Sequence, residues 1–231
     1  MATFTKGVHC ASCNLKMNIF CHLDEGQLEI INKDRYEVHF HKGEVIFKQG
    51  SPLTHIACLT NGLAKIYIEG KDKKNMILKI LKPTELVAGP GFSIDYRHHY
   101  TVSALVDSSA CLVDIHAFEE MIKANAEFAF GFIKYRNQKT LNLHERLMSL
   151  THKQMHGRIA DALLYLAKDI YLSNTFETPL TRQDIADLSA MTKESAIRIL
   201  KELKDDNIID FTTSGFTILN EPSLVQISIT G

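Results

Sequence analysis

The sequence predicts an α+β chain with a β-rich N-terminal half, a long helix, and a C-terminal helix-turn-helix followed by a β wing. Three observations support this prediction. Short β-rich runs alternate with turn signals from Tyr36 to about Phe118. A helical run without proline, AEFAFGFIKYRNQKTLNLHERLMSL, follows them. Beyond residue 180, two short helical patterns with capping residues precede two apolar runs typical of strands.

The N-terminal half begins with a short helix expected over residues 24–35, with Leu28 and Ile31 turned inward and Ile30 as a further candidate for the inward face. Four β-rich runs follow it: YEVHFHKGEVIFKQG, HIACLTNGLAKIYIEG, NMILKILKPTELVAG and YTVSALVDSSACLVDI. Turn signals such as Asn61-Gly62 separate the runs. This spacing indicates a small antiparallel barrel or sandwich.

The composition of the 231 residues is ordinary for a globular protein, with 45% hydrophobic and 23% charged residues. No apolar run approaches ~18 residues, so we expect no membrane span. The N-terminus carries no signal-peptide pattern, and the expected location is therefore cytoplasmic. The net charge of −1 gives no support to nucleic-acid binding and does not exclude it. Three of the five cysteines crowd into residues 10–21, which favours metal or redox chemistry.

The helical run of about 25 residues is longer than one small barrel can cover. Its best apolar stripe consists of Phe132, Ile133, Leu141, Leu143, Leu147 and Leu150. We interpret this helix as a subunit interface, and the alternative is packing along its own domain. A second helix, HGRIADALLYLAKDIYL, and a polar connector at residues 173–179 follow it.

The segment after the connector has the pattern of a helix-turn-helix. Thr181 and Asp184 form a near capping box that opens a helix through about Leu188. Thr192 caps a second helix through about Lys204, after a break at residues 189–191. The apolar set between them is Ile185, Ala186, Leu188, Met191, Ala196, Ile199, Leu200 and Leu203. Residues 207–211 and 216–219 are predicted strands of a wing.

In such a motif the second helix enters the major groove of DNA, where its N-terminal residues meet base edges. Lys193, Glu194 and Arg198 lie on one side of that helix. Arginine can hold guanine O6 and N7, and glutamate can accept from cytosine N4. The alternative is a solvated helix face with a Glu–Arg pair one turn apart.

The segment LTRQDIADLSAMTKESAIRILKELKDDNII resembles the winged helix-turn-helix of the Crp/Fnr family of bacterial transcription regulators. The matching positions are Thr181, Arg182, Asp184, Ile185, Ala186, Thr192, Glu194, Arg198, Leu200 and Leu203. The sequence departs from the family pattern at Ala190, the place of the turn glycine, and at Lys193, Ser195 and Ile197. KGEVIFKQG resembles a turn of the family's β-roll.

The resemblance implies an N-terminal β-roll of the cyclic-nucleotide-binding type, a long dimerisation helix and a C-terminal winged helix-turn-helix. It divides the chain into a cysteine-bearing leader (1–22), a β-roll sensor domain (23–118), a dimerisation helix (119–150) and a DNA-binding domain (151–231). The implied function is sequence-specific DNA binding by a homodimeric transcription regulator, which is not an enzyme. The implied partners are a palindromic operator in double-stranded DNA and RNA polymerase, with no membrane.

The resemblance also assigns roles to the DNA-binding residues. Glu194 and Arg198 would read bases, and Lys193 would contact a base or a phosphate. The remaining DNA-binding set consists of Thr181, Arg182 and Gln183, as phosphate contacts, with Thr192 and Ser195.

The signal sensed by the β-roll is not fixed by the family. Members that hold cyclic AMP carry a Gly-Glu pair and an Arg-Ser pair that clamps the phosphate. The equivalent stretch here, VAGPGFSIDYRHHYTVSA, has neither, and about Thr101-Val102 take the place of Arg-Ser. A cyclic phosphodiester without its cation clamp would bind poorly, which argues against cyclic AMP.

Members of the Fnr type instead hold a [4Fe-4S] cluster through a leader pattern C-x2-C-x5-C and one cysteine in the β-roll. The leader here reads Cys10-x2-Cys13-x7-Cys21, and Cys111 matches the place of the fourth ligand. The resemblance therefore implies a [4Fe-4S] cluster on Cys10, Cys13, Cys21 and Cys111 that responds to redox state, oxygen or nitric oxide.

Several alternatives to an iron–sulfur cluster stay open. The same thiols could hold zinc, act as a thiol switch, or be vestigial, with a small-molecule effector or none. Cys58 is interpreted as a small buried hydrophobe. A haem or metal alternative rests on His9, His22, His39, His41, His98 and His99. An enzyme on a cupin-like roll would need a carboxylate or later histidine to join His39 and His41, and no convincing one is seen.

Overall fold

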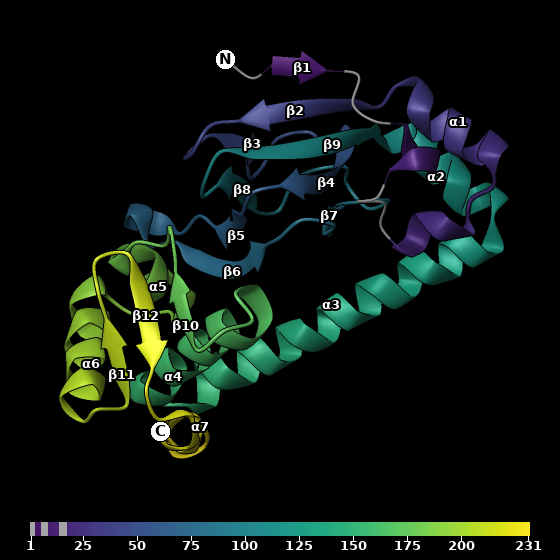
Figure 1. Ribbon diagram of the computed structural model, residues 1–231. Helices are drawn as coiled ribbons and strands as arrows, with labels where there is room; N and C mark the ends of the chain where they lie inside the picture. Colours follow the sequence, from purple (N-terminus) through teal and green to yellow (C-terminus); the bar gives the residue numbers. More distant parts are fainter. Residues whose placement is uncertain (1–2, 6–8, 14–17) are drawn as a thin grey trace. The chain divides into compact units, whose positions relative to one another are not determined.

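The computed structural model describes residues 3–5, 9–13 and 18–231 (Figure 1). The chain forms two compact units, which are described separately. The first comprises residues 1–69 and 80–140, and the second comprises residues 70–79 and 141–231. The division falls inside the longest helix and assigns the tip of one β-hairpin to the C-terminal unit.

The N-terminal strands form two antiparallel sheets, as the turn spacing predicts for a sandwich or roll. One sheet has the order β1 (Thr3–Thr5), β2 (Tyr36–Phe40), β9 (Ser108–Asp114), β4 (His55–Asn61), β7 (Leu86–Val87). The other has the order β3 (Val45–Phe47), β8 (Thr101–Ala104), β5 (Ala64–Ile68), β6 (Met76–Leu81), with η3 (Lys71–Lys73) between β5 and β6. The register of β9 against β2 and β4 places Cys111 between Glu37 and Cys58.

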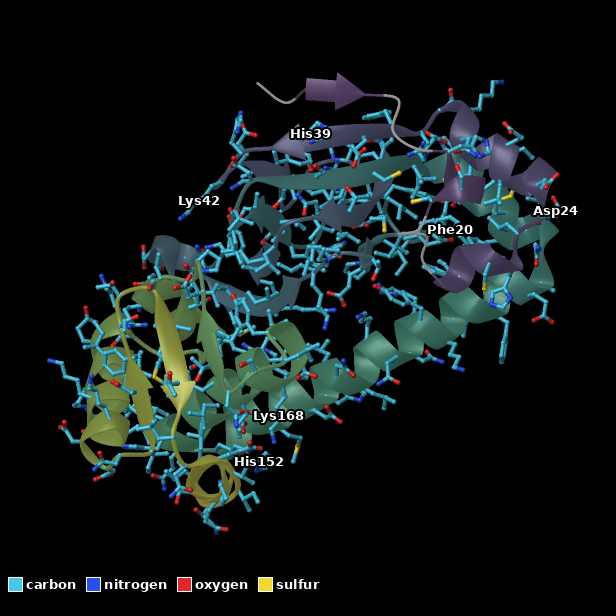
Figure 2. The ribbon with its side chains drawn as sticks, in the orientation of Figure 1. Phe20, Asp24, His39, Lys42, His152 and Lys168 are labelled. Atoms are coloured by element: carbon cyan, nitrogen blue, oxygen red, sulfur yellow. The ribbon has the colours of Figure 1, made fainter. Side chains whose placement is uncertain are left out.

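Helices cover one end of the first unit, where Phe20 and Asp24 also lie (Figure 2). They are η1 (Cys10–Ser12), η2 (Asn18–His22), α1 (Glu25–Lys33), α2 (Ile115–Ala124) and the start of α3 (Ala126–His152). Asp24 and Gln27 form a capping box at the start of α1. Leu28 and Ile31 are buried as predicted, whereas Ile30 is 43% exposed. The predicted helix over 119–150 is thus two helices, separated at Asn125.

The second unit continues with α4 (Met155–Tyr165), the π-helix η4 (Leu166–Ile170), β10 (Thr175–Glu177), α5 (Arg182–Leu188) and α6 (Lys193–Asp205). It ends with β11 (Ile209–Phe211), β12 (Gly215–Ile218) and α7 (Glu221–Thr230). The polar connector at 173–179 contains a strand, β10, which pairs with β12. Phe176 explains the difference, because this one apolar side chain is buried and stacks on Tyr171.

The predicted helix-turn-helix is confirmed in its local chemistry. Thr181 accepts from the backbone N–H of Asp184 and Asp184 accepts from that of Thr181, which completes the capping box. Thr192 accepts from the N–H of Ser195 at the start of α6. The predicted apolar set between the helices is buried, apart from the half-buried Met191.

Ala190 adopts a left-handed backbone conformation, with φ 48°, in the turn between α5 and α6. The Cβ of a residue other than glycine is strained in this left-handed conformation, whereas glycine, which lacks a Cβ, adopts it without strain. We expect Ala190→Gly to raise the free energy of unfolding by about 0.5–1 kcal/mol in urea denaturation. Asn207, with φ 57°, provides the matched control, since Asn207→Ala should lower it. An Ala190→Gly variant no more stable than wild type would contradict this account of the turn.

Candidate functional site

The exposed face of α6 carries the predicted base-reading residues. Lys193, Glu194 and Arg198 are all exposed near its N-terminal end. The opposite face is fixed in the core by Ala196, Ile199, Leu200 and Leu203. Residues four apart lie on the same side of a helix, so Glu194 and Arg198 share one face. The polar side chains can therefore reach outward without disturbing the packing of the helix.

Arg198 is held by an ion pair at the surface of the second unit. Its Nη1 lies 2.7 Å from Oε1 of Glu202, and Oε2 of Glu202 lies 2.7 Å from Nε2 of His156. The alternative prediction was a pair between Arg198 and Glu194. Arg198 instead pairs with Glu202, one turn further along α6. The side chains of Arg198 and Glu202 are 53% and 41% exposed. Such exposed pairs contribute little, so the guanidinium can leave Glu202 for a stronger partner.

Arg182 joins α5 to the wing. Its Nη2 donates to the carbonyl of Thr212 at 2.7 Å. Its guanidinium also lies 4.9 Å from the ring centre of Phe211 and 4.7 Å from that of Phe216. Burial lowers the pKa of Arg182. This residue therefore stabilises the wing itself, and its contact with phosphate stays a prediction.

The other predicted phosphate contacts have local partners in the same unit. Gln183 donates from Nε2 to Oδ1 of Asp187 at 2.7 Å, and the hydroxyl of Thr181 belongs to the capping box. Thr192 and Ser195 form the cap of α6. These residues set the position of the two helices, and their contact with DNA stays a prediction.

A second group of chemically active residues lies where the leader meets the sheet of the first unit. Cys58 on β4 and Cys111 on β9 are cross-strand partners. Cys10 and Cys111 pack against the hydrophobic cluster that contains Cys58. The backbone N–H of Cys10 donates to Oδ1 of Asn32 at 3.0 Å, which fixes η1 against α1. Cys13 closes η1, with its N–H directed to the carbonyl of Cys10.

Arg35 is buried beside these thiols, with only 8% of its surface exposed. Its Nη1 donates to Sγ of Cys111 at 3.2 Å, and its Nε donates to Oδ1 of Asn32 at 3.2 Å. Burial acts to lower the pKa of Arg35, but Cys111, Cys10 and Cys13 together raise it above its ordinary value. Burial raises the pKa of Cys111, and Arg35 opposes that rise.

Cys21 differs from these thiols in its exposure. It is exposed, on η2, whereas Cys10 and Cys13 are half-buried. Its neighbour Phe20 is buried, and the carbonyl of His22 accepts from Nδ2 of Asn125 at 2.8 Å. The structure therefore packs Cys10 and Cys111 against the same hydrophobic cluster, whereas Cys21 is exposed on η2.

Cys58 is buried in the hydrophobic cluster, as predicted, whereas Arg35 beside Cys111 was missed from the sequence. Only strand register places Cys58 beside Cys111, and no local motif encodes it. Among the described residues, no three His, Cys, Asp or Glu side chains form a group that could hold a metal ion. The thiols are thus neighbours but not a formed coordination sphere.

The loop at the place of the cyclic-nucleotide pocket contains a buried histidine. His98 is 1% exposed and stacks on Phe47, with ring centres 4.2 Å apart. Neither ring nitrogen has a hydrogen-bond partner. Arg97, in the same loop, donates from Nη1 to the carbonyl of Gly50 at 2.9 Å.

A β-roll followed by a winged helix-turn-helix defines a DNA-binding protein with a sensor domain. The family comparisons agree: residues 37–125 match the cyclic nucleotide-binding domain and residues 157–227 match the Crp-like helix-turn-helix domain. The chain belongs to the Crp/Fnr family of transcription regulators. Members of this family are DNA-binding regulators rather than enzymes. Within the described residues, no helix has the length and apolarity needed to cross a membrane.

Relatives within the family include a transcriptional activator and a cAMP-activated regulator. The transcriptional activator FnrL of Cereibacter sphaeroides is 25% identical over 209 residues, covering 87% of this chain and 83% of that protein. The cAMP-activated regulator CRP of Salmonella typhimurium is 24% identical, covering 74% of this chain and 85% of that protein. The fold is similar to that of FixK2 from Bradyrhizobium japonicum, with TM-score 0.77, 19% identity, and coverage of 84% of this chain and 98% of that one.

The buried His98 makes stability sensitive to acid. Burial, followed by repulsion from His99, lowers the pKa of His98 from 6.5 to about 4. Between these two pKa values the unfolded chain binds more protons at this histidine than the folded chain does. The free energy of unfolding therefore keeps the full contribution of neutral His98 above pH 6.5 and loses it as the pH decreases toward 4. The expected loss is up to about 3 kcal/mol. Urea denaturation at several pH values should show a smaller loss in His98→Phe, and equal losses would exclude His98 as the cause.

Proposed function

We propose that this chain is a dimeric transcription regulator whose DNA affinity is set by an iron–sulfur cluster on the thiols of the leader and β-roll. The observation that carries the proposal is the position of Arg35. Its guanidinium donates to Sγ of Cys111 at 3.2 Å, and a cation beside a thiol favours the thiolate. The thiolate is the form that binds a metal, because coordination removes the thiol proton.

The chemistry of the donor set fits a [4Fe-4S] cluster held by four thiolates. Such a cluster, when bound, supplies a centre that responds to redox state, oxygen or nitric oxide. Cys10, Cys13 and Cys21 would hold it from the leader, and Cys111 would hold it from β9. Arg35 would offset the negative charge of the thiolates from its position beside Cys111.

The leader connects the thiols to the long helix. Ile19 and Phe20 are buried in one hydrophobic cluster with Phe128 and Phe132 of α3. Fixing Cys10 and Cys13 to the sheet would keep this part of the leader in place against α3. Release of the thiols would loosen the packing of the leader on α3. The position of α3 in the dimer interface would then change.

The exposed side of α3 supports its role in dimerisation. Its exposed apolar residues are Phe130, Ile133, Leu141, Leu143, Leu147 and Met148. A second copy of the helix would cover them, as members of this family are dimers. The two recognition helices would then read the halves of a palindromic operator, and the bound dimer would contact RNA polymerase.

A second candidate is control by a small molecule in the β-roll without a cluster. The orphaned ring nitrogens of His98 favour it, because a ligand with a hydrogen-bonding group would satisfy them. The first candidate also has a variant in which the same thiols hold zinc in place of an iron–sulfur cluster.

The cluster is tested by purification without oxygen. We expect a brown protein with a broad visible band that air bleaches, and ~4 iron and ~4 sulfide per chain. Fluorescence anisotropy should show that this form dimerises and binds a palindromic site more tightly than the same protein after cluster removal. Equal affinities would contradict control by the cluster. Absence of iron after reconstitution would favour zinc, if zinc is present, or the small-molecule candidate.

The register of the recognition helix is tested at Arg198. Arg198→Ala should weaken binding by about 1–3 kcal/mol per half-site and relax the preference at one base pair, because a bidentate contact to guanine is lost. Lys201→Ala, a change at another exposed cation of α6, is the control and should leave base preference intact. Binding to a library of operator variants measures both effects. Unchanged preference in Arg198→Ala would show that another residue reads that base.

A further inference from the structure

Glu202 lies next to the predicted base reader Arg198 on α6, one helical turn further from the N-terminus of that helix. Helical side chains lean toward the N-terminus, so the side chain of Glu202 lies over the turn that carries Arg198. Oε1 of Glu202 accepts from Nη1 of Arg198 at 2.7 Å. The carboxylate therefore holds one nitrogen of the guanidinium in the protein without DNA.

A second helix holds the same carboxylate from its other side. Oε2 of Glu202 lies 2.7 Å from Nε2 of His156, which is the second residue of α4. An ionised carboxylate can only accept hydrogen bonds, so Nε2 of His156 carries the proton. The hydrogen bond from His156 has the largest influence on Glu202 and, together with that from Arg198, lowers its pKa. Glu202 thus stays ionised, and its two oxygens are bound by groups from two different helices.

The bond to Glu202 leaves Arg198 able to read a base. A guanidinium has five N–H donors, and a bidentate contact to guanine O6 and N7 uses two of them. Glu202 accepts from Nη1 alone. The pair is exposed and weak enough to break, but recognition of guanine does not require it to break. A guanidinium that is already held on one side has fewer orientations to lose when it meets a base.

We propose that Glu202, oriented by His156, is a positioning residue that presets Arg198 for guanine and so raises the specificity of DNA recognition. This inference rests on the proposed role of Arg198 as a base reader. Glu202 touches no base in this role. Its negative charge repels the phosphates of every sequence alike, so it weakens binding to DNA in general while it strengthens the preference at one base pair. A residue that only adds charge or stability would not have these two opposite effects.

The test compares Glu202→Ala with the charge control Asp205→Asn, a change at the exposed last residue of α6. The whole 231-residue chain, prepared without oxygen, selects from a pool of randomised double-stranded DNA, and sequencing before and after selection gives the base preferences. Glu202→Ala should reduce the preference at the base pair read by Arg198 by about three- to tenfold, the range for ordering one long side chain. Asp205→Asn should leave that preference unchanged. Both variants should bind DNA of unrelated sequence more tightly, because each removes a negative charge.

Further variants separate positioning from a structural role. Glu202→Gln keeps an oxygen that can accept from Arg198, so it should recover most of the preference that Glu202→Ala loses. His156→Ala should lower the preference at the same base pair, by less than Glu202→Ala does. In an Arg198→Ala background, Glu202→Ala should change no base preference, because both residues act on one contact. Circular dichroism checks the fold of each variant.

Arg198→Ala separates the two levels of the inference. If it lowers the preference and Glu202→Ala does not, the positioning role is overturned while the base-reading role of Arg198 stands. The positioning role is also overturned if the effect of Glu202→Ala on base preference persists in the Arg198→Ala background. If Arg198→Ala leaves the preference unchanged, both roles are overturned. Should Glu202→Ala fail to fold, His156→Ala decides, since a lowered preference supports positioning and an unchanged one overturns it.

Discussion

The packing of four aromatic rings around Phe118 is the interaction that holds the elements of the first unit together. Its ring is 0% exposed and meets Phe20 of the leader, Phe92 of the loop after β7, and Phe128 and Phe132 of α3. Edge-to-face contacts of this kind add to the free energy of burial and fix the relative angles of the elements that supply the rings. The leader, the loop and α3 therefore cannot shift independently, because each loses contact with the same side chain.

The thiol site adds a second constraint of opposite character. Apolar packing tolerates an occasional void, but a buried cation such as Arg35 must be compensated. Asn32 occupies one donor of its guanidinium and Cys111 another. Asn32 also accepts from the backbone of Cys10, so the same amide orients the cation and the leader. The hydrogen bonds of Asn32 and Arg35 thus link the leader to α1 and β9 independently of the aromatic cluster.

The sequence predicted the parts of the fold that rest on local chemistry. Thr181, Asp184 and Thr192 mark helix starts by their own hydrogen bonds, and the turn residues mark the strand ends. β10 and α7 escaped prediction, since the strand has one buried residue, Phe176, and α7 has two, Leu224 and Ser228. The register between strands could not be predicted, so the pairing of Cys58 with Cys111 was not foreseen, although the burial of Cys58 was. The predicted roles of Cys21 and of the DNA-binding side chains rested on the cysteine spacing and the helix-turn-helix pattern together with the family resemblance.

The second unit contains a direct connection between α3 and the helix-turn-helix. Arg146, on the C-terminal part of α3, donates from Nη2 to the carbonyl of Ile77 at 2.7 Å and to the carbonyl of Leu188. Burial lowers the pKa of this guanidinium, so its hydrogen bonds cannot be lost without cost. Leu188 is the last residue of α5, immediately before the turn that sets the angle of α6. A rotation of α3 would move Arg146 and, through its bond to Leu188, displace the turn between α5 and α6. The orientation of α6 would then change while its contacts with α5 stay the same.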